Sequence, residues 1–340
     1  MPTFSPPALL AVAQTILEAA GAPPDLALVV GHSLVESNLV GHDSHGILRL
    51  RQYLDLIRLG KLLPAARASL LSQTQATARV DGARGWGQPA AQMAAQLAIA
   101  LAQEYGVGVV TIDRCNHIGR VGEYVETISR SAMIGLAMCN TEAVVAPFGG
   151  RQGRLGTNPL AWAMPRGAGR EPLLVDFATS GVAEGKLRVA RDKGERVPLG
   201  LLVDREGHPS PVPADYYAGG ALLPFGGHKG YGIGVVIELM AGALSGMGPS
   251  AAPDYPGGNG TLIMALSIAR FIPVEQFTAQ AELLSEKIKA TPTAEGFSEV
   301  LVPGEPEWRA RRERLATGIS LPEPTWQDIQ ALARGLNVTL

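Results

Sequence analysis

Hydrophobic positions divide the chain into a helical beginning and a middle with shorter periods. Residues 1 to about 75 have the spacing of helices, with breaks at Gly41 and Gly60. From there the period changes: a strand at 76–80 is followed by an alanine-rich helix and a second strand within 89–112. This part of the chain therefore predicts a strand–helix–strand unit.

The rest of the chain predicts further short strands and a helical end. Glycine and proline between these strands are too dense for regular helical crossovers, so we expect a mixed sheet. The further strands are expected at 134–139, 159–164, 173–176 and 262–268, and the helices at 233–245, 274–290, 307–316 and 326–336. The last helices are expected to pack against the first ones.

Composition is typical of a folded globular protein with small-molecule partners. The chain has 340 residues, of which 46% are hydrophobic and 18% charged, enough for a large core and two domains. The net charge of -2 and the near absence of Lys/Arg runs argue against a nucleic-acid surface. No apolar run reaches the length of a membrane span, so no membrane partner is expected.

Cysteine use and the first helix favour a cytoplasmic protein. Cys115 and Cys139 both lie in apolar strand contexts, which predicts reduced, buried thiols rather than a disulfide. Residues 8–20 are apolar but interrupted by Glu18 and lack a preceding basic region. They predict an amphipathic helix rather than a signal peptide.

The densest chemistry lies between Gly41 and Tyr53. If a helix begins at Asp43 or Ser44, then His42, His45, Arg49 and Tyr53 project within a sector of roughly 80°. A helix N-terminus beside His45 favours a neutral imidazole, and Arg49 can bind a carboxylate through two hydrogen bonds. An acid/base group beside an anion-binding group suits carbonyl chemistry on an acid.

Two other interpretations of these histidines stay open. Each can be a structural group at a helix junction, as His42 in particular can be. A metal site is disfavoured, since the His42-x-x-His45 spacing has no third ligand nearby and no Cys pair completes it. We expect no metal.

Glycine-rich segments offer several candidate sites for a phosphate or a cofactor. The motif G-x-G-x-x-A at 85–90 resembles a dinucleotide fingerprint, but the preceding strand alternates instead of being fully apolar, so a plain turn before a helix is favoured. Asn116-His117 begins a glycine-containing turn after a strand. The loop at 224–232, with His228 and Lys229 ahead of an apolar helix, is the best phosphate candidate.

Several motifs, taken in order, resemble the type 2 malate/L-lactate dehydrogenase family. They are Asp43-Ser44-His45-Gly46 with Arg49 and Tyr53, Asn116-His117, Gly156-Thr157-Asn158-Pro159, Asp176-Phe177-Ala178-Thr179-Ser180, Gly226-Gly227-His228-Lys229-Gly230-Tyr231-Gly232, and Pro303-Gly304-Glu305. The resemblance spans nearly the whole chain. It implies an α/β fold of the α+β type that is not a Rossmann fold.

The resemblance also implies domains and residue roles. Residues 1–75 together with 303–340 would form a helical domain, and residues 76–302 a mostly antiparallel mixed-sheet domain that binds NAD(P). His45 would donate the proton, assisted by Ser44, while Arg49, Tyr53, His117 and Thr157 would lie near the substrate. The implied cofactor contacts are His117, Ile118, Gly119, Arg120, Val121, Asp176, Phe177, Ala178, His228, Lys229, Gly304 and Glu305.

The activity implied is NAD(P)-dependent hydride transfer at C2 of a small, anionic 2-oxo or 2-hydroxy acid by a homodimer. The main alternative is an NADPH-dependent reductase of a cyclic imino acid, delta1-pyrroline-2-carboxylate or delta1-piperideine-2-carboxylate. A more distant one is a protein that binds an anionic metabolite without catalysis. NADH and NADPH stay open, because no Rossmann landmark locates the partner of a 2′-phosphate.

Overall fold

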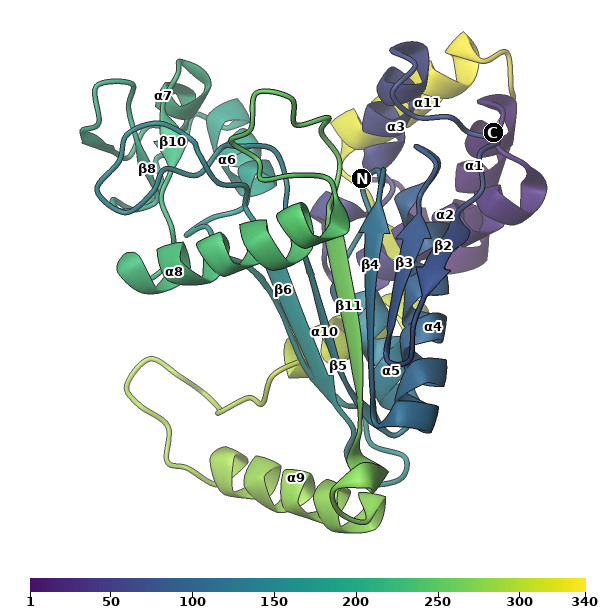
Figure 1. Ribbon diagram of the computed structural model, residues 1–340. Coiled ribbons are helices and arrows are strands. Elements are labelled where there is room, and N and C mark those ends of the chain that lie inside the picture. Colours follow the sequence, from purple (N-terminus) through teal and green to yellow (C-terminus); the bar gives the residue numbers. More distant parts are fainter.

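A seven-stranded sheet forms the centre of the computed structural model, which describes the backbone of residues 1–340 and every side chain except that of Asp192 (Figure 1). The strand order is β2-β3-β4-β11-β5-β6-β7. The strands are β2 (Ser69–Gln73), β3 (Thr77–Asp81), β4 (Val107–Asp113), β5 (Met133–Cys139), β6 (Pro159–Met164), β7 (Leu173–Ala178) and β11 (Thr261–Ser267). Only β3 and β4 pair in parallel, so the sheet is mixed and mainly antiparallel.

Helices cover both faces of this sheet and gather at one end of it (Figure 1). The α-helices are α1 (Pro6–Ala19), α2 (Pro24–Leu39), α3 (Arg49–Arg58), α4 (Gly87–Tyr105), α5 (Gly122–Arg130), α6 (Glu184–Asp192), α7 (Pro213–Tyr217), α8 (His228–Ile237), α9 (Val274–Lys289), α10 (Glu305–Thr317) and α11 (Glu323–Gly335). Helix α8 continues as a π-helical turn, Glu238–Ala243. No described helix has both the length and the hydrophobicity needed to cross a lipid bilayer.

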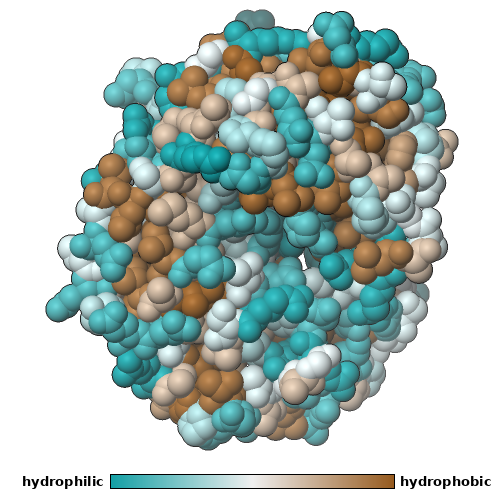
Figure 2. Space-filling model, turned by 90° about the vertical axis from the view of Figure 1, so that its right-hand side faces the viewer, coloured by the Kyte–Doolittle hydropathy of each residue, from teal (hydrophilic) through white to brown (hydrophobic). Residues whose placement is uncertain are grey.

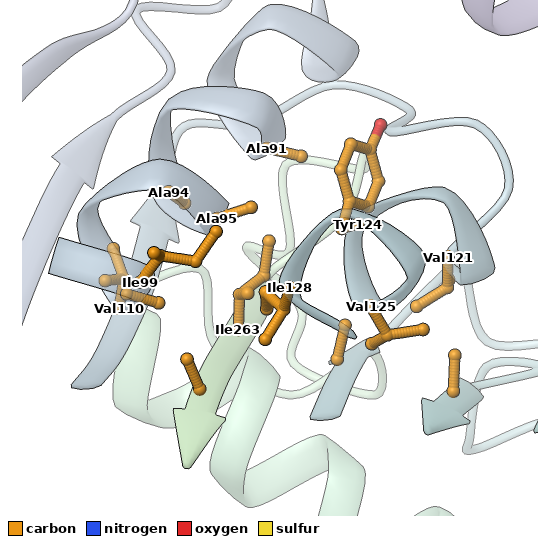
Figure 3. Close-up of a cluster of buried hydrophobic side chains, with 14 of the residues drawn as sticks. Ala91, Ala94, Ala95, Ile99, Val110, Val121, Tyr124, Val125, Ile128 and Ile263 are labelled. Atoms are coloured by element: carbon orange, nitrogen blue, oxygen red, sulfur yellow. The ribbon is translucent and has the colours of Figure 1, made fainter. Parts of the chain in front are cut away.

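Alternation along the strands supplies a core on each face of the sheet. On β11, Ile263 and Ala265 point toward α4 and α5, whereas Leu262 joins Ile237 of α8 on the opposite face. The alanines of α4, spaced at helical intervals, let this helix lie close to the sheet (Figure 3). The strand–helix–strand prediction is confirmed, with α4 as the crossover between parallel strands.

The two ends of the chain share a second core. Strand β1 (Thr3–Phe4) pairs with β12 (Ile319–Ser320), and Leu9, Leu34 and Leu50 pack in one cluster with Ile329. The last helices therefore pack against the first ones, as predicted. On the side of the molecule shown in Figure 2, hydrophobic residues lie in separate groups among hydrophilic ones.

One sequence prediction needs correction, and other features were not predicted. Residues 69–73, predicted as part of the helical beginning, form edge strand β2; all five are exposed, so no hydrophobic period marked them. Trp308 lies on α10 but packs in the core of the sheet. The small strands β8 (Leu202–Val203), β9 (Pro209–Ser210) and β10 (Ala221–Leu222) were missed, because two residues are too few to show a period. The division into two domains stays a prediction.

Candidate active site

A cavity of about 620 Å³ brings together side chains that lie far apart in the sequence. His45 and Arg49 line one wall, His117 and Gly119 come from the segment after β4, and Thr157 lies just before β6. Five of the predicted site residues thus share one pocket. This volume is in the usual range of small-molecule sites.

The segment around His45 is not the single helix predicted from Asp43 to Gly60. Asp43–His45 form a separate 3-10 turn, Gly46 is extended, and α3 begins only at Arg49. Asn38 causes the break: its amide oxygen accepts the Ile47 N–H at 2.9 Å, and its Nδ2 donates to Asp43 at 2.6 Å. A Cβ on Gly46 would overlap the Asn38 side chain, so glycine is needed there.

Helix α10, near the end of the chain, holds the same turn. Arg314 donates to both carboxylate oxygens of Asp43, at 2.7 and 3.0 Å. His42 Nε2 lies 3.4 Å from Glu307 of α10 and does not line the cavity. His42 therefore does not share a face with His45, and its contact is a structural one.

His45 and Arg49 are oriented by their immediate neighbours. Nδ1 of His45 lies 3.0 Å from the Ser44 hydroxyl. Arg49 Nε donates to the Ser44 carbonyl at 2.7 Å, and its Nη1 donates to Gln52 at 2.6 Å. The guanidinium is thus held on the wall of the cavity beside the imidazole.

Two imidazoles face each other in the cavity, and both are held neutral. The rings of His45 and His117 stack with centroids 5.5 Å apart and an angle of 21° between their planes. Removal from water is the main cause that lowers the pKa of His45 to about 3, and the positive charge of Arg49 is the second. The same two causes hold the pKa of His117 well below its usual value. Burial, and not the predicted helix N-terminus, is thus the main reason that His45 is neutral.

Tyr53 lies behind His117 instead of in the cavity. Its side chain is 1% exposed, and its hydroxyl lies 2.9 Å from His117 Nδ1. Gln88 Nε2 donates to the same hydroxyl at 2.7 Å. Tyr53, predicted near the substrate, does not line this cavity and reaches it only through His117.

A buried carboxylate holds the Thr157 loop. Glu238, in the π-helical turn after α8, accepts the Gly156 N–H and an N–H of the Asn158 amide, both at 2.9 Å. It also accepts from Ser250. Thr157 lies between two residues that this one carboxylate binds. Its position in the cavity wall therefore depends on Glu238 of the π-helical turn.

The segment after His117 is mostly buried. Ile118 and Val121 belong to the core of the sheet, so only their backbone is available to a ligand. Arg120 is 3% exposed, yet its Nε and Nη1 have no hydrogen-bond partner among the described residues. Asp176 of β7 accepts the Gly122 N–H at 2.7 Å, which brings this strand to the start of α5.

The other predicted cofactor residues lie away from the cavity. Phe177 packs edge-on against Phe225, with ring centroids 5.5 Å apart, and Ala178 ends β7 beside it. His228 and Lys229 are exposed and begin α8, so the loop predicted over 224–232 is half helix. The helix predicted from residue 233 thus begins five residues earlier, and glycines at 230, 232 and 234 obscured this start, because glycine has low helix propensity.

Gly304 and Glu305 lie at the start of α10. Glu305 pairs with Lys289 and Arg309 and borders a second cavity of about 610 Å³. Gly304 contacts Leu174 at the beginning of β7. Neither residue lines the cavity that holds His45.

Comparison with known proteins shows which family this chain belongs to. Residues 4–330 match the family model for malate/L-lactate dehydrogenase. The chain is 37% identical over 338 residues to an L-lactate dehydrogenase of Cupriavidus necator, an alignment that covers 97% of this chain and 96% of the relative. The chain belongs to the malate/L-lactate dehydrogenase family. It is therefore an oxidoreductase of the dehydrogenase type, and the family implies a nicotinamide cofactor.

Solved structures of the family share the whole mixed α/β fold. The sulfolactate dehydrogenase of Methanocaldococcus jannaschii matches with a TM-score of 0.90 at 34% identity, covering 99% of this chain and 98% of that one. A delta1-piperideine-2-carboxylate reductase of Pseudomonas syringae pv. tomato matches with 0.86 at 30% identity, covering 98% and 100%. This chain thus shares its fold with a protein named as a sulfolactate dehydrogenase and with one named as a piperideine-carboxylate reductase.

Sequence reasoning missed several residues of this dehydrogenase site. Gln52 follows Arg49 by one helical turn and could have been found from that spacing. Gln88 lies within the motif at 85–90, which is interpreted from the sequence as a plain turn before a helix. Asn38, Lys61 and Glu142 gave no signal, because only the folded chain brings them to the cavity or to the His45 turn.

The depressed pKa of His45 predicts a pH-dependent stability for this family member. The unfolded chain binds a proton at His45 below about pH 6.5, whereas the folded chain does not until about pH 3. The free energy of unfolding should therefore fall as pH decreases through this window. Denaturant unfolding of His45→Gln at pH 7 and 4.5 should show a weaker pH dependence than the native chain.

His208→Gln is the matched control, since His208 is exposed on a loop. It should keep the native dependence. His117 titrates in the same direction, so His45→Gln should retain part of the effect. An identical slope in His45→Gln and the native chain would contradict the assignment.

Proposed function

We propose that this chain is an NAD(P)-dependent dehydrogenase that interconverts a small 2-hydroxy acid and the corresponding 2-oxo acid. One observation carries the proposal: two neutral, stacked imidazoles, His45 and His117, share a cavity with the guanidinium of Arg49. The imidazoles supply a proton donor and a hydrogen-bond donor for a carbonyl oxygen. Arg49 supplies the charge that a neighbouring carboxylate requires.

The residues around the cavity fit a nicotinamide dinucleotide. Arg120 is a buried cation with two nitrogens that lack a protein partner, which suits a phosphate or ribose oxygen. Gly119, with a positive φ, lines the cavity, and Gly122 is required because a Cβ there would press on Arg120 and Asp176. When bound, the cofactor supplies or accepts the hydride at C2.

We assign the cofactor contacts to the predicted residues according to where they lie. His117, Gly119, Arg120 and Asp176 would act nearest the cavity, with Ile118 and Val121 contributing only their backbone. Phe177, Ala178, His228 and Lys229 would meet more distant parts of the cofactor, and Gly304 and Glu305 the most distant. The charge of Lys229 at the start of α8 suits a phosphate.

His45 is the group that exchanges the proton. Because it is neutral, it can accept the hydroxyl proton when the 2-hydroxy acid is oxidised, and in the reverse direction its protonated form returns that proton to the oxygen at C2. The Ser44 hydroxyl fixes its ring through Nδ1. A substrate carboxylate at Arg49 would offset the positive charge that disfavours protonated His45, so binding prepares the imidazole to carry a proton.

Arg49 and Thr157 hold the substrate from opposite walls. Arg49 uses Nε and Nη1 for Ser44 and Gln52, which fixes the plane of the guanidinium for a carboxylate. The Thr157 hydroxyl, 3.3 Å from that of Thr141, is a polar group on the other wall. Tyr53 acts only through His117.

Removal of the proton-exchanging group should abolish turnover. His45→Ala should lower kcat at least 100-fold, because general acid–base catalysis contributes about 10²–10⁴. Cofactor affinity, measured by the change in nucleotide fluorescence on binding, should change less than about twofold, because His45 acts on the substrate proton and does not bind the cofactor. His208→Ala is the control with native rates. Full turnover by His45→Ala would refute the proposal.

Replacing the guanidinium that is proposed to bind the substrate carboxylate should mainly affect substrate binding. Arg49→Lys loses the planar pair of donors, so KM for the 2-oxo acid should rise about tenfold or more while kcat changes little. Arg51→Lys is a matched control, since Arg51 lies on the same helix but pairs with Asp328 of α11. An unchanged KM in Arg49→Lys would show that the carboxylate binds elsewhere.

A cyclic imino acid is the alternative substrate, favoured by the structural match to a piperideine-carboxylate reductase. Its carboxylate and ring nitrogen could use the same Arg49 and His45. Cofactor oxidation should be measured with pyruvate, oxaloacetate, delta1-pyrroline-2-carboxylate and delta1-piperideine-2-carboxylate, each with NADH and NADPH. Turnover confined to the two imines would replace the hydroxy-acid proposal.

We also propose that the enzyme is a homodimer. After His228 and Lys229, the exposed side of α8 and its π-helical extension carries the apolar side chains Val236, Leu239 and Met240, followed by Leu244 just beyond, each at least 38% exposed. Such a continuous apolar helix face is typical of a protein interface. Sedimentation of the full chain as a monomer at working concentration would contradict this.

A further inference from the structure

Gln88 is a buried polar residue that the proposed chemistry leaves unused. It lies at the start of α4, in the glycine motif that resembled a dinucleotide fingerprint, and is fully buried. Its Nε2 donates to the Tyr53 hydroxyl at 2.7 Å, and that hydroxyl lies 2.9 Å from Nδ1 of His117. Gln88, Tyr53 and His117 thus form a chain of hydrogen bonds that ends at the cavity.

The direction of this chain follows from the single proton of a phenol. Because the Tyr53 oxygen accepts from Gln88, its own O–H is free to donate, and Nδ1 of His117 is the acceptor in reach. In the orientation of Gln88 that the structure shows, where its Oε1 has no partner among the described residues, a proton on Nδ1 would leave the Tyr53 hydrogen facing a second donor. A buried hydroxyl without an acceptor loses its hydrogen bond to water without replacement, so the first arrangement is favoured.

Close packing keeps Gln88 in place. The preceding Gly87 lies so near the chain at Asn116 and His117 that a Cβ would collide with both carbonyl oxygens. Trp86 donates from Nε1 to the Pro64 carbonyl at 2.9 Å and packs edge-on against Tyr53. The glycine motif therefore presses the start of α4 against the segment that carries His117.

We propose that Gln88 is a positioning residue that fixes the tautomer of His117. Through Tyr53 it makes Nδ1 an acceptor, so the proton resides on Nε2, and His117 presents an N–H donor to the cavity. His45 has only the Ser44 hydroxyl on its Nδ1, and a hydroxyl can either donate or accept. His45 can therefore exchange its proton, whereas His117 is held as a donor.

This arrangement gives the two imidazoles, His45 and His117, different chemical roles. His117 would donate a hydrogen bond to a substrate oxygen without taking a proton from it, and His45 would carry out the transfer. The substrate oxygen in this assignment rests on the proposed dehydrogenase function. The tautomer itself does not, because it is a property of the folded chain alone.

Nitrogen NMR of the full chain tests the tautomer directly. The protein would be labelled with ¹⁵N only in its six histidines, and His117 assigned by the signals lost in His117→Gln. At neutral pH we expect a protonated Nε2 and a bare Nδ1 for His117, with the bare nitrogen far downfield. A protonated Nδ1, or two signals averaged between the tautomers, would overturn the proposal.

A second arm tests whether Gln88 sets this state. Gln88→Met keeps the length of the side chain but removes the donor, so the two His117 nitrogen signals should move toward each other. The kcat/KM for the 2-oxo acid should fall about three- to tenfold, the effect of roughly one hydrogen bond, with an unchanged KM for the cofactor. Gln96→Met, on the exposed side of the same helix, is the control.

The outcomes separate the two proposals. If Gln88→Met leaves both His117 signals at their native positions, Gln88 does not set the tautomer and the inference is wrong. If the signals behave as expected but no 2-hydroxy or 2-oxo acid is turned over, the role of Gln88 in fixing the His117 tautomer stands and the proposed substrate class fails.

Discussion

The exclusion of charge from two facing imidazoles is the constraint on which this site depends. His45 and His117 stack beside Arg49, in surroundings where a second positive charge is costly. The arrangement leaves one permanent cation and two neutral rings in the same cavity. An anionic substrate would relieve the remaining charge, so the charge of the site itself favours such a ligand.

Buried hydrogen bonds hold these three side chains at the edges of apolar cores. Asn38 breaks the helix before Arg49 and so turns His45 toward the cavity, while Arg314 pins the same turn from α10. On the other wall, Glu238 binds the residues on each side of Thr157. Each anchor comes from a different part of the chain. The hydrophobic clusters bring the parts together, and the polar anchors set their orientation.

Much of the fold could be predicted from the sequence, because its elements are long and periodic. The alanine-rich helix α4, the apolar strands β4, β5 and β11, and the terminal helices lie where their periods placed them. The predictions that went wrong concern short or irregular segments. The exposed edge strand β2 has no period, and the glycines of α8 hide the start of a helix that was predicted only from residue 233.

The candidate site was predictable in its residue types but not in its geometry. The sequence by itself determined that His45, Arg49 and His117 were available for acid–base chemistry on an anion, because few other roles combine these groups in glycine-rich turns. Only the tertiary structure decided that Tyr53 lies behind His117, that His42 turns to Glu307, and that Gln88 joins the site. The reason is physical: hydrophobic periods report which side of an element is buried, whereas a hydrogen bond between distant residues depends on how whole elements meet.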